Sequence, residues 1–177
     1  MAKLAGSGLS VGMNTLRALS LLAATITMGL VAGVFALYAH TIMPGLKKTD
    51  DRTFVAAFQS LDRAIINPWF MAGAFLGALA FTLAAALTNL GHDALPWIGA
   101  ALVLYLIAFV ITIAVNVPLN DALKAAGDPD RIHDLAAVRE RFQEARWAAW
   151  NLVRVVTSVG AFGCLAWALV LYGRATG

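Results

Sequence analysis

The chain has 177 residues, of which 60% are hydrophobic and 13% are charged, and it carries a formal net charge of +3. Soluble domains have about 25% charged residues, whereas here four apolar runs each approach the roughly 20 residues that a bilayer-spanning helix needs. This composition excludes a soluble protein. The basic residues are dispersed among acids, which excludes a nucleic-acid-binding groove. We predict an all-α integral membrane four-helix bundle, a single domain over residues 1–177, in a bacterial plasma membrane.

The first apolar run predicts a membrane span over about residues 18–43. It is longer than the roughly 7–15 residues of a signal-peptide core, so we expect an uncleaved membrane helix. Pro44 and Gly45 should end it. His40 lies near that end, either as an interfacial anchor or as a base, because it is the only histidine close to a span.

A shorter amphipathic helix should follow, with Thr49 as its predicted N-cap. The segment is too polar to span a membrane, so it should lie in the interface or fold back over the mouth of the bundle. Its apolar stripe is Phe54, Phe58, Leu61 and Ile65, and polar residues recur every four positions on another face, at Gln59, Arg63 and Asn67.

Asn67 and Pro68 are typical of a helix start and open a second predicted span over about residues 68–87. The third predicted span covers about residues 95–115. Pro118 should kink or end the helix that follows, because it lacks a backbone N–H. If the chain stays close to helical there, Asn116 and Asn120 share one face.

The segment Asp128-Pro129-Asp130 predicts the start of a long amphipathic helix that leads into a fourth span, about residues 152–172. Four residues before and within this span fall at i, i+3, i+4 and i+7, so they should share one helix face. A charge carried into an apolar segment is costly and usually faces a bundle interior or a functional site. The four residues are Trp147, Trp150, Asn151 and Arg154.

This layout places the segments 44–67 and 116–150 on one side of the membrane and both termini on the other. Basic residues are concentrated on the side of the two long segments, which the positive-inside rule assigns to the cytoplasm. That side carries Lys47, Lys48, Arg52, Arg63, Lys124, Arg131, Arg139, Arg141 and Arg146, and the other carries Lys3, Arg17 and Arg174.

The polar groups at the helix ends should meet on one side of the bundle and form a pocket with two guanidinium groups and aromatic walls. Such a pocket suits an anionic or polarisable oxygen ligand, unless Asp62 and Asp121 neutralise the arginines. The predicted catalytic residues are Arg63, Asn116, Arg154 and His40, and the predicted substrate-binding residues are Gln59, Asn67, Asn120, Trp147, Trp150 and Asn151.

We expect no metal and no cofactor at this site. The three histidines are scattered, and no acidic residue lies within a predicted span, so a metal-ligand set is lacking. Neither a glycine-rich dinucleotide motif nor a P-loop occurs in the sequence.

Four ordered motifs resemble the DUF1772, or anthrone oxygenase-like, family of membrane proteins: residues 43–46, 59–70, 116–120 and 147–154. The resemblance implies a four-helix membrane protein. In fungal polyketide pathways, relatives of this family oxidise an anthrone to an anthraquinone with O₂ and no evident cofactor, so the resemblance implies an oxygenase activity. The family often has a histidine where this chain has Leu152, so a base would have to come from elsewhere, from His40, Asp62 or Asp121.

Two functions follow. The first is an oxygenase that acts on an activated aromatic CH₂, with arginine and asparagine stabilising the oxyanion. The alternative is a non-enzymatic small membrane protein that binds or transports a hydrophobic anion. The expected partners are the lipid bilayer and a small hydrophobic aromatic substrate, and a homo-oligomer is left open.

Overall fold

The computed structural model describes residues 2–176, with side chains from residue 12 onward, so the side chain of Lys3 lies outside the described part. All regular elements in this range are helical, and three short π-helical segments interrupt them. In chain order the elements are α1 (Ala2–Leu37), η1 (Tyr38–Ile42), α2 (Met43–Leu46), α3 (Asp51–Ile65), η2 (Trp69–Leu76), α4 (Gly77–Thr88), α5 (Leu95–Ile111), η3 (Thr112–Asn116), α6 (Val117–Ala125), α7 (Leu135–Phe142) and α8 (Glu144–Thr176).

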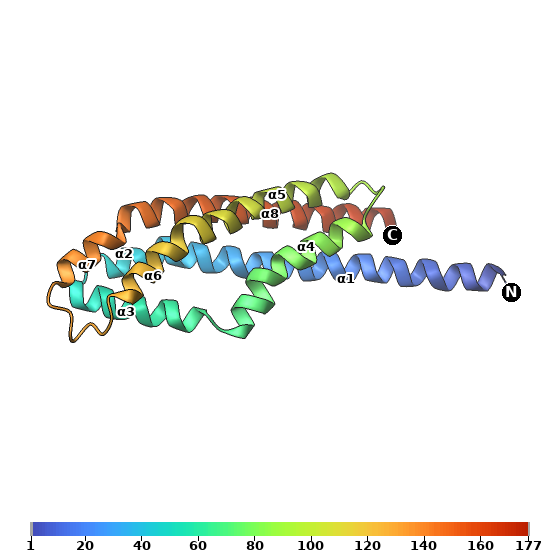
Figure 1. Cartoon of the computed structure of the whole chain (residues 1–177). Coiled ribbons are helices and arrows are strands. Elements are labelled where there is room, and N and C mark those ends of the chain that lie inside the picture. The colour runs from blue at the N-terminus through green and yellow to red at the C-terminus, as the bar shows by residue number, and fades with distance from the viewer. Residues whose placement is uncertain (1, 177) are drawn as a thin grey trace.

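Four stretches of the described chain are long and apolar enough to cross a membrane, which confirms the predicted all-α fold with four spans. They run from Gly12 to Leu46, Trp69 to Thr88, Leu95 to Ala125 and Leu135 to Thr176. The start of α1 and the end of α8 lie at one end of the bundle, and α2, α3, α6 and α7 gather at the other (Figure 1). Which end faces the cytoplasm stays a prediction.

Pro118 does not end its helix. The π-helical η3 precedes it, and the chain continues as α6 to Ala125. A proline removes one backbone hydrogen bond and crowds the preceding turn. The wider π turn directly before the proline accommodates it, so the third span stays continuous and carries Asn116 and Asn120 beyond the predicted end at residue 115.

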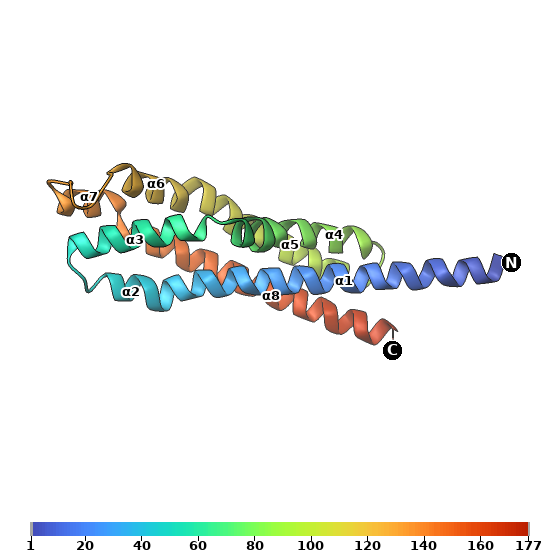
Figure 2. The ribbon, with the colours of Figure 1, turned by 90° about the horizontal axis from the view of Figure 1, so that it is seen from below.

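Helix α3 folds back beside α2 and the end of α1 (Figures 1 and 2), and its buried face differs from the predicted stripe. Phe54 and Phe58 are buried as predicted, but Leu61 is 37% exposed, and Gln59 and Asp62 take its place inside. Hydrogen bonds explain why Gln59 is buried: its amide donates to the backbone carbonyls of Leu123 and Gly127, each at 3.0 Å.

The buried face of α3 builds a second core against the ends of the other helices at this end of the bundle. Phe58 lies 4.6 Å from Phe142 of α7 and edge-on to Trp147 of α8, measured between ring centroids. Arg139 of α7 closes this cluster by pairing with Asp51 at 3.0 Å. The short helices therefore form a packed cap on the four spans, while the first core lies among α1, α4, α5 and α8.

Asp50, not the predicted Thr49, caps α3. The Thr53 backbone N–H donates to Asp50 at 2.9 Å and the Thr53 hydroxyl at 2.7 Å, whereas the Thr49 hydroxyl turns back to the Leu46 carbonyl. The bonds from Thr53 lower the pKa of Asp50, so its charged form stabilises the folded state at neutral pH. That contribution is lost as the pH falls below about 4.

An Asp50→Ala variant should therefore melt at a lower temperature than the wild type near neutral pH, and the difference should shrink in acid. Melting curves at about pH 7 and about pH 3.5 check this. Asp50→Asn is the control, because it keeps the cap acceptor without the charge. An equal loss at both pH values would mean that the charge of Asp50 adds nothing, and no loss near neutral pH would contradict the assigned cap.

The predicted long helix from residue 128 is broken in two places. Asp128 closes a local turn by accepting from the backbone N–H of Asp130, and α7 begins only at Leu135, capped by Asp134. Gln143 then adopts a left-handed conformation, with φ of 53°, and separates α7 from α8. This break turns α7 aside to cover α3, while α8 continues into the membrane.

The other end of the bundle is held by Arg17 of α1. This arginine is 6% exposed and donates to Asn89 in the turn between α4 and α5 at 3.2 Å and to Asn14 at 3.3 Å. Its guanidinium also lies 5.1 Å from the ring centroid of Tyr172. Arg17 thus links α1, the α4–α5 turn and α8.

Candidate functional site

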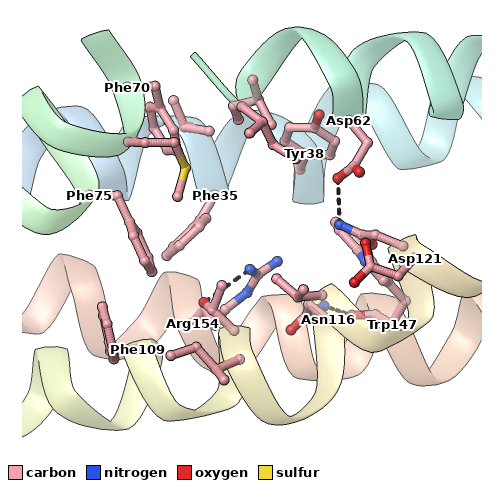
Figure 3. A pocket seen from close by; sticks show the side chains of 18 of the residues that line it. Phe35, Tyr38, Asp62, Phe70, Phe75, Phe109, Asn116, Asp121, Trp147 and Arg154 are labelled. Atoms are coloured by element: carbon pink, nitrogen blue, oxygen red, sulfur yellow. Dashed lines mark hydrogen bonds between the residues drawn. The ribbon is translucent and has the colours of Figure 1, made fainter. Parts of the chain in front are cut away.

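A cavity of about 360 Å³ lies between the two cores, where the spans meet the cap. Residues of all four spans and of α3 line it, and most of its wall is apolar (Figure 3). Cavities of this size, with apolar walls and a few polar groups, are typical small-molecule sites. The cavity wall has three parts, which are an aromatic end, a central arginine and a polar end.

The aromatic end is built by α5 and η2. The rings of Phe75 and Phe109 stack with centroids 5.0 Å apart, and Phe70 stacks on Phe75 at 6.5 Å. The buried Tyr105 hydroxyl donates to the Phe75 carbonyl at 2.6 Å, which fixes the π-helical wall against α5. Offset aromatic surfaces of this kind suit a flat polycyclic ligand.

Arg154 of α8 occupies the centre of the cavity and is 5% exposed. It donates to the Asn151 side-chain oxygen at 2.8 Å and to the Thr112 hydroxyl at 3.2 Å. Its guanidinium carbon lies 4.3 Å from the Phe35 ring centroid. Among the described residues no carboxylate pairs with it, and its Nε has no hydrogen-bond partner. A buried cation without a counter-ion favours an anionic ligand.

Two asparagines hold the helices around this arginine. Asn151 is fully buried and donates to the Phe35 carbonyl at 3.1 Å, which ties α8 to α1. Asn116 donates to the Trp147 carbonyl at 3.2 Å, which ties η3 to α8. The side-chain oxygen of Asn116 is buried and accepts no hydrogen bond within the described structure, so it can accept one from a ligand hydroxyl.

The polar end is a hydrogen-bonded group from three elements. Asp62 of α3 is 6% exposed, accepts from the Asn120 amide at 2.6 Å and pairs with Lys124 at 2.6 Å. Lys124 also pairs with the exposed Asp121 at 3.0 Å, and the Trp147 indole donates to Asn120 at 2.7 Å. The two aspartates therefore neutralise this lysine, and not the arginines as the sequence-based alternative held.

All three π-helical segments border the cavity. Eight lining residues belong to them, and π segments inside α-helices often mark functional sites. The residues are Tyr38, Phe70, Met71, Phe75, Leu76, Thr112, Ile113 and Asn116.

The structure brings together part of the predicted site. Asn116, Asn120, Trp147 and Arg154 all line the cavity, and Asn151 supports Arg154 from behind. The predicted common face of α8 thus holds for three residues. Trp150 is the exception, because it is 39% exposed and does not line the cavity.

The other predicted residues lie outside the cavity wall. His40 is exposed and hydrogen-bonds Thr41. Arg63 is exposed one turn from Gln59 and is bonded to it at 3.1 Å, so the expected neighbour of Arg154 points elsewhere. Gln59 bonds backbone carbonyls inside the cap, and the Asn67 side-chain oxygen accepts from the Phe70 N–H at the start of η2.

Sequence reasoning missed Thr112 and Lys124 as cavity residues. A signal was present, since Thr112, Asn116, Asn120 and Lys124 are spaced four apart. On a straight α-helix such a row drifts by about 40° per step. The π turn of η3 holds more residues per turn and rotates the row back, so all four residues face one cavity.

Residues 58–164, more than half of the chain, match the anthrone oxygenase family. No curated protein and no solved structure matches the chain. The matched range includes Asp62, Asn116, Asn120, Trp147 and Arg154, which are polar or amphipathic residues of the cavity wall. The chain therefore belongs to the anthrone oxygenase family, as the resemblance of its ordered motifs predicted.

Proposed function

We propose that this protein is a membrane oxygenase that binds a polycyclic phenol and oxidises an activated CH₂ between two of its rings with O₂. One observation carries the proposal. Arg154 is buried in an aromatic-walled cavity, without a carboxylate partner among the described residues. A positive charge held this way stabilises negative charge that develops on a bound oxygen, which is the requirement for forming a phenolate or enolate.

The cavity walls support a defined orientation of such a ligand. The flat rings would lie against Phe75 and Phe109, and an oxyanion would bind Arg154, whose Nε is free to donate. A neighbouring phenolic hydroxyl would donate to the unpartnered oxygen of Asn116. These groups distinguish a hydroxylated polycycle from a plain hydrocarbon of the same size, because a hydrocarbon would leave them unpaired.

Asp62 is the proposed proton acceptor in place of His40, which lies outside the cavity. It is the buried carboxylate of the wall, whereas Asp121 is exposed. Asp62 removes one CH₂ proton, and Arg154 stabilises the resulting oxyanion. The electron-rich carbon then reacts with O₂ to give a peroxide, which takes up the proton from Asp62. Loss of the second C–H proton breaks the O–O bond and gives a ketone and water. One O₂ is consumed per substrate, and both electron pairs come from the substrate.

The test is oxygen uptake by the purified protein in lipid nanodiscs with 1,8-dihydroxyanthrone, after subtraction of the rate with empty discs. We expect one O₂ consumed per ketone formed. Asp62→Asn should lower the rate by about 100-fold or more, the range typical of a lost general base. Asp93→Asn is the matched control, because Asp93 is exposed at the opposite end of the bundle.

Binding of 1,8-dihydroxyanthraquinone, the product of this reaction, should persist in Asp62→Asn, which shows that the variant is folded. Oxygen uptake equal to that of empty discs, together with tight product binding, would contradict the oxygenase and favour the hydrophobic-anion binder. Full activity in Asp62→Asn would remove Asp62 from the mechanism.

A further inference from the structure

Two lipid-facing stripes run along the second and third spans. Along η2 and α4 the large exposed apolar side chains include Trp69, Leu76, Leu83 and Leu87, and along α5, η3 and α6 they include Val103, Val110, Ile113 and Val117. Within the α-helical parts, spacings of four and seven keep Leu83 with Leu87 and Val103 with Val110 on one helix face. Because both spans are long enough to cross the membrane, these faces contact hydrocarbon.

The two stripes converge at the wall of the cavity. Leu76 is 47% exposed and Ile113 is 55% exposed, yet both line the cavity, as do the exposed Val117 and Ile66. These four side chains are aliphatic, and because they are exposed and also line the cavity, they border its opening. Ile66 directly follows α3 and Leu76 ends η2, whereas Ile113 and Val117 belong to η3 and α6. The opening therefore faces the acyl chains of the bilayer.

The aqueous end of the cavity is obstructed in a different way. There Asp62 accepts from Asn120 and pairs with Lys124, each at 2.6 Å, and Lys124 also pairs with Asp121 at 3.0 Å. A flat apolar molecule that enters from this side would have to separate these ion pairs and leave the buried Asp62 without its partners. Breaking a buried pair is strongly unfavourable.

We propose that the cavity is filled sideways from the bilayer, through a portal between Ile66 and Leu76 on one rim and Ile113 and Val117 on the other. The ligand is an aromatic compound dissolved in lipid. Its rings pass between the aliphatic rims, and its oxygen binds Arg154. The portal rests on the proposed function only for the class of ligand, a polycyclic phenol, and does not require that the ligand react with O₂.

The experiment measures binding kinetics of 1,8-dihydroxyanthraquinone, which contains no CH₂ to oxidise, in nanodiscs of a Cys164→Ser protein. Ile113→Cys, modified with N-cyclohexylmaleimide, carries a bulky group at the portal. Val110→Cys, modified in the same way, is the matched control, because Val110 is equally lipid-facing but does not line the cavity. Asp121→Cys, modified with a charged thiosulfonate, obstructs the aqueous end. Each cysteine variant is compared with its own unmodified form, so that the loss of the Lys124–Asp121 pair is present on both sides of the comparison.

Modification at position 113 should slow association and dissociation together, each by about tenfold, with little change in Kd, because a portal alters the barrier and not the bound state. Modification at 110 or 121 should leave both rates unchanged. Slower binding at 121 with normal rates at 113 would overturn the proposal in favour of access from water. A weaker Kd at 113 without slower dissociation would also overturn it, since the group would then occupy the site itself.

Failure of the two proposals is distinguishable. If the unmodified protein binds the quinone but consumes no O₂ with the anthrone, the proposed oxygenase activity is wrong, and the binding kinetics still test the portal. If the unmodified protein does not bind the quinone, the ligand class is wrong and the portal as stated fails with it.

Discussion

An Arg154→Leu variant is expected to bind hydroxylated polycyclic aromatics with an affinity about 10- to 100-fold lower than that of the wild type. A hydrogen bond to a charged group contributes roughly 1.5–3 kcal/mol to the binding free energy. The reason is the position of Arg154, buried at the centre of the cavity with its Nε unpartnered. The rate of oxidation should fall by at least the same factor, because the oxyanion forms only after the ligand is bound. Equilibrium binding of 1,8-dihydroxyanthraquinone and oxygen uptake measure the two effects.

The stability of the same variant is expected to change little. Removing a buried, unpaired charge relieves its desolvation cost, but it leaves the Asn151 oxygen without its donor at 2.8 Å. The lost hydrogen bond costs about 1–3 kcal/mol, so the two effects oppose each other. We expect a melting temperature within a few degrees of the wild type, because about 1 kcal/mol shifts it by roughly 2–4 °C in a protein of this size.

Arg63→Leu is the matched control. It removes the same charge from the same protein, but Arg63 is exposed and outside the cavity wall, so binding should be unchanged. Arg154→Lys refines the test, since a lysine keeps the charge without the planar array of donors. An Arg154→Leu protein that keeps full affinity and full stability would show that the cavity does not select for an anion.

The centre of the site was predictable from spacing alone. Trp147, Asn151 and Arg154 repeat at i, i+4 and i+7 on one helix, and an internal arginine has few places to point other than the bundle interior. Asn116 and Asn120 followed from the same rule on the third span. Periodicity within one helix therefore identified three residues of α8 and the two asparagines of η3 and α6, but not Thr112 and Lys124, which line the cavity from the same two segments.

What the spacing could not supply was the relation between elements. Arg63 shares the polar character of Arg154, but α3 is rotated so that Gln59 and Asp62 point inward, since Leu123, Gly127 and Lys124 of other segments bind them. His40 belongs to the π-helical η1, which contributes Tyr38 and not His40 to the cavity wall, and an α-helical periodicity does not show where a wider π turn occurs. The residues that bind Gln59 and Asp62 lie some 60 or more positions further along the chain, so no local sequence pattern could reveal them.

The second large effect is expected in the cap, where Phe58→Asp should lower the melting temperature in detergent by roughly 6–20 °C. Phe58 is 1% exposed and contacts Phe54, Phe142 and Trp147 with centroid distances of 6.2, 4.6 and 5.7 Å. Loss of a buried aromatic side chain costs about 3–5 kcal/mol. The new carboxylate would also lie four residues before Asp62 on the same helix face, so like charges would repel.

Leu61→Asp separates this effect from a general intolerance of α3 to acidic residues. Leu61 is on the same helix and 37% exposed, so its substitution should change the stability by no more than about 0.5 kcal/mol, as for other surface positions. A large loss at position 58 with little change at 61 requires α3 to pack in the observed orientation. Equal losses at both positions would mean that the helix has no fixed buried face. An unchanged melt at position 58 would mean that the cap, and with it the Asp62 end of the cavity, does not pack on the four spans.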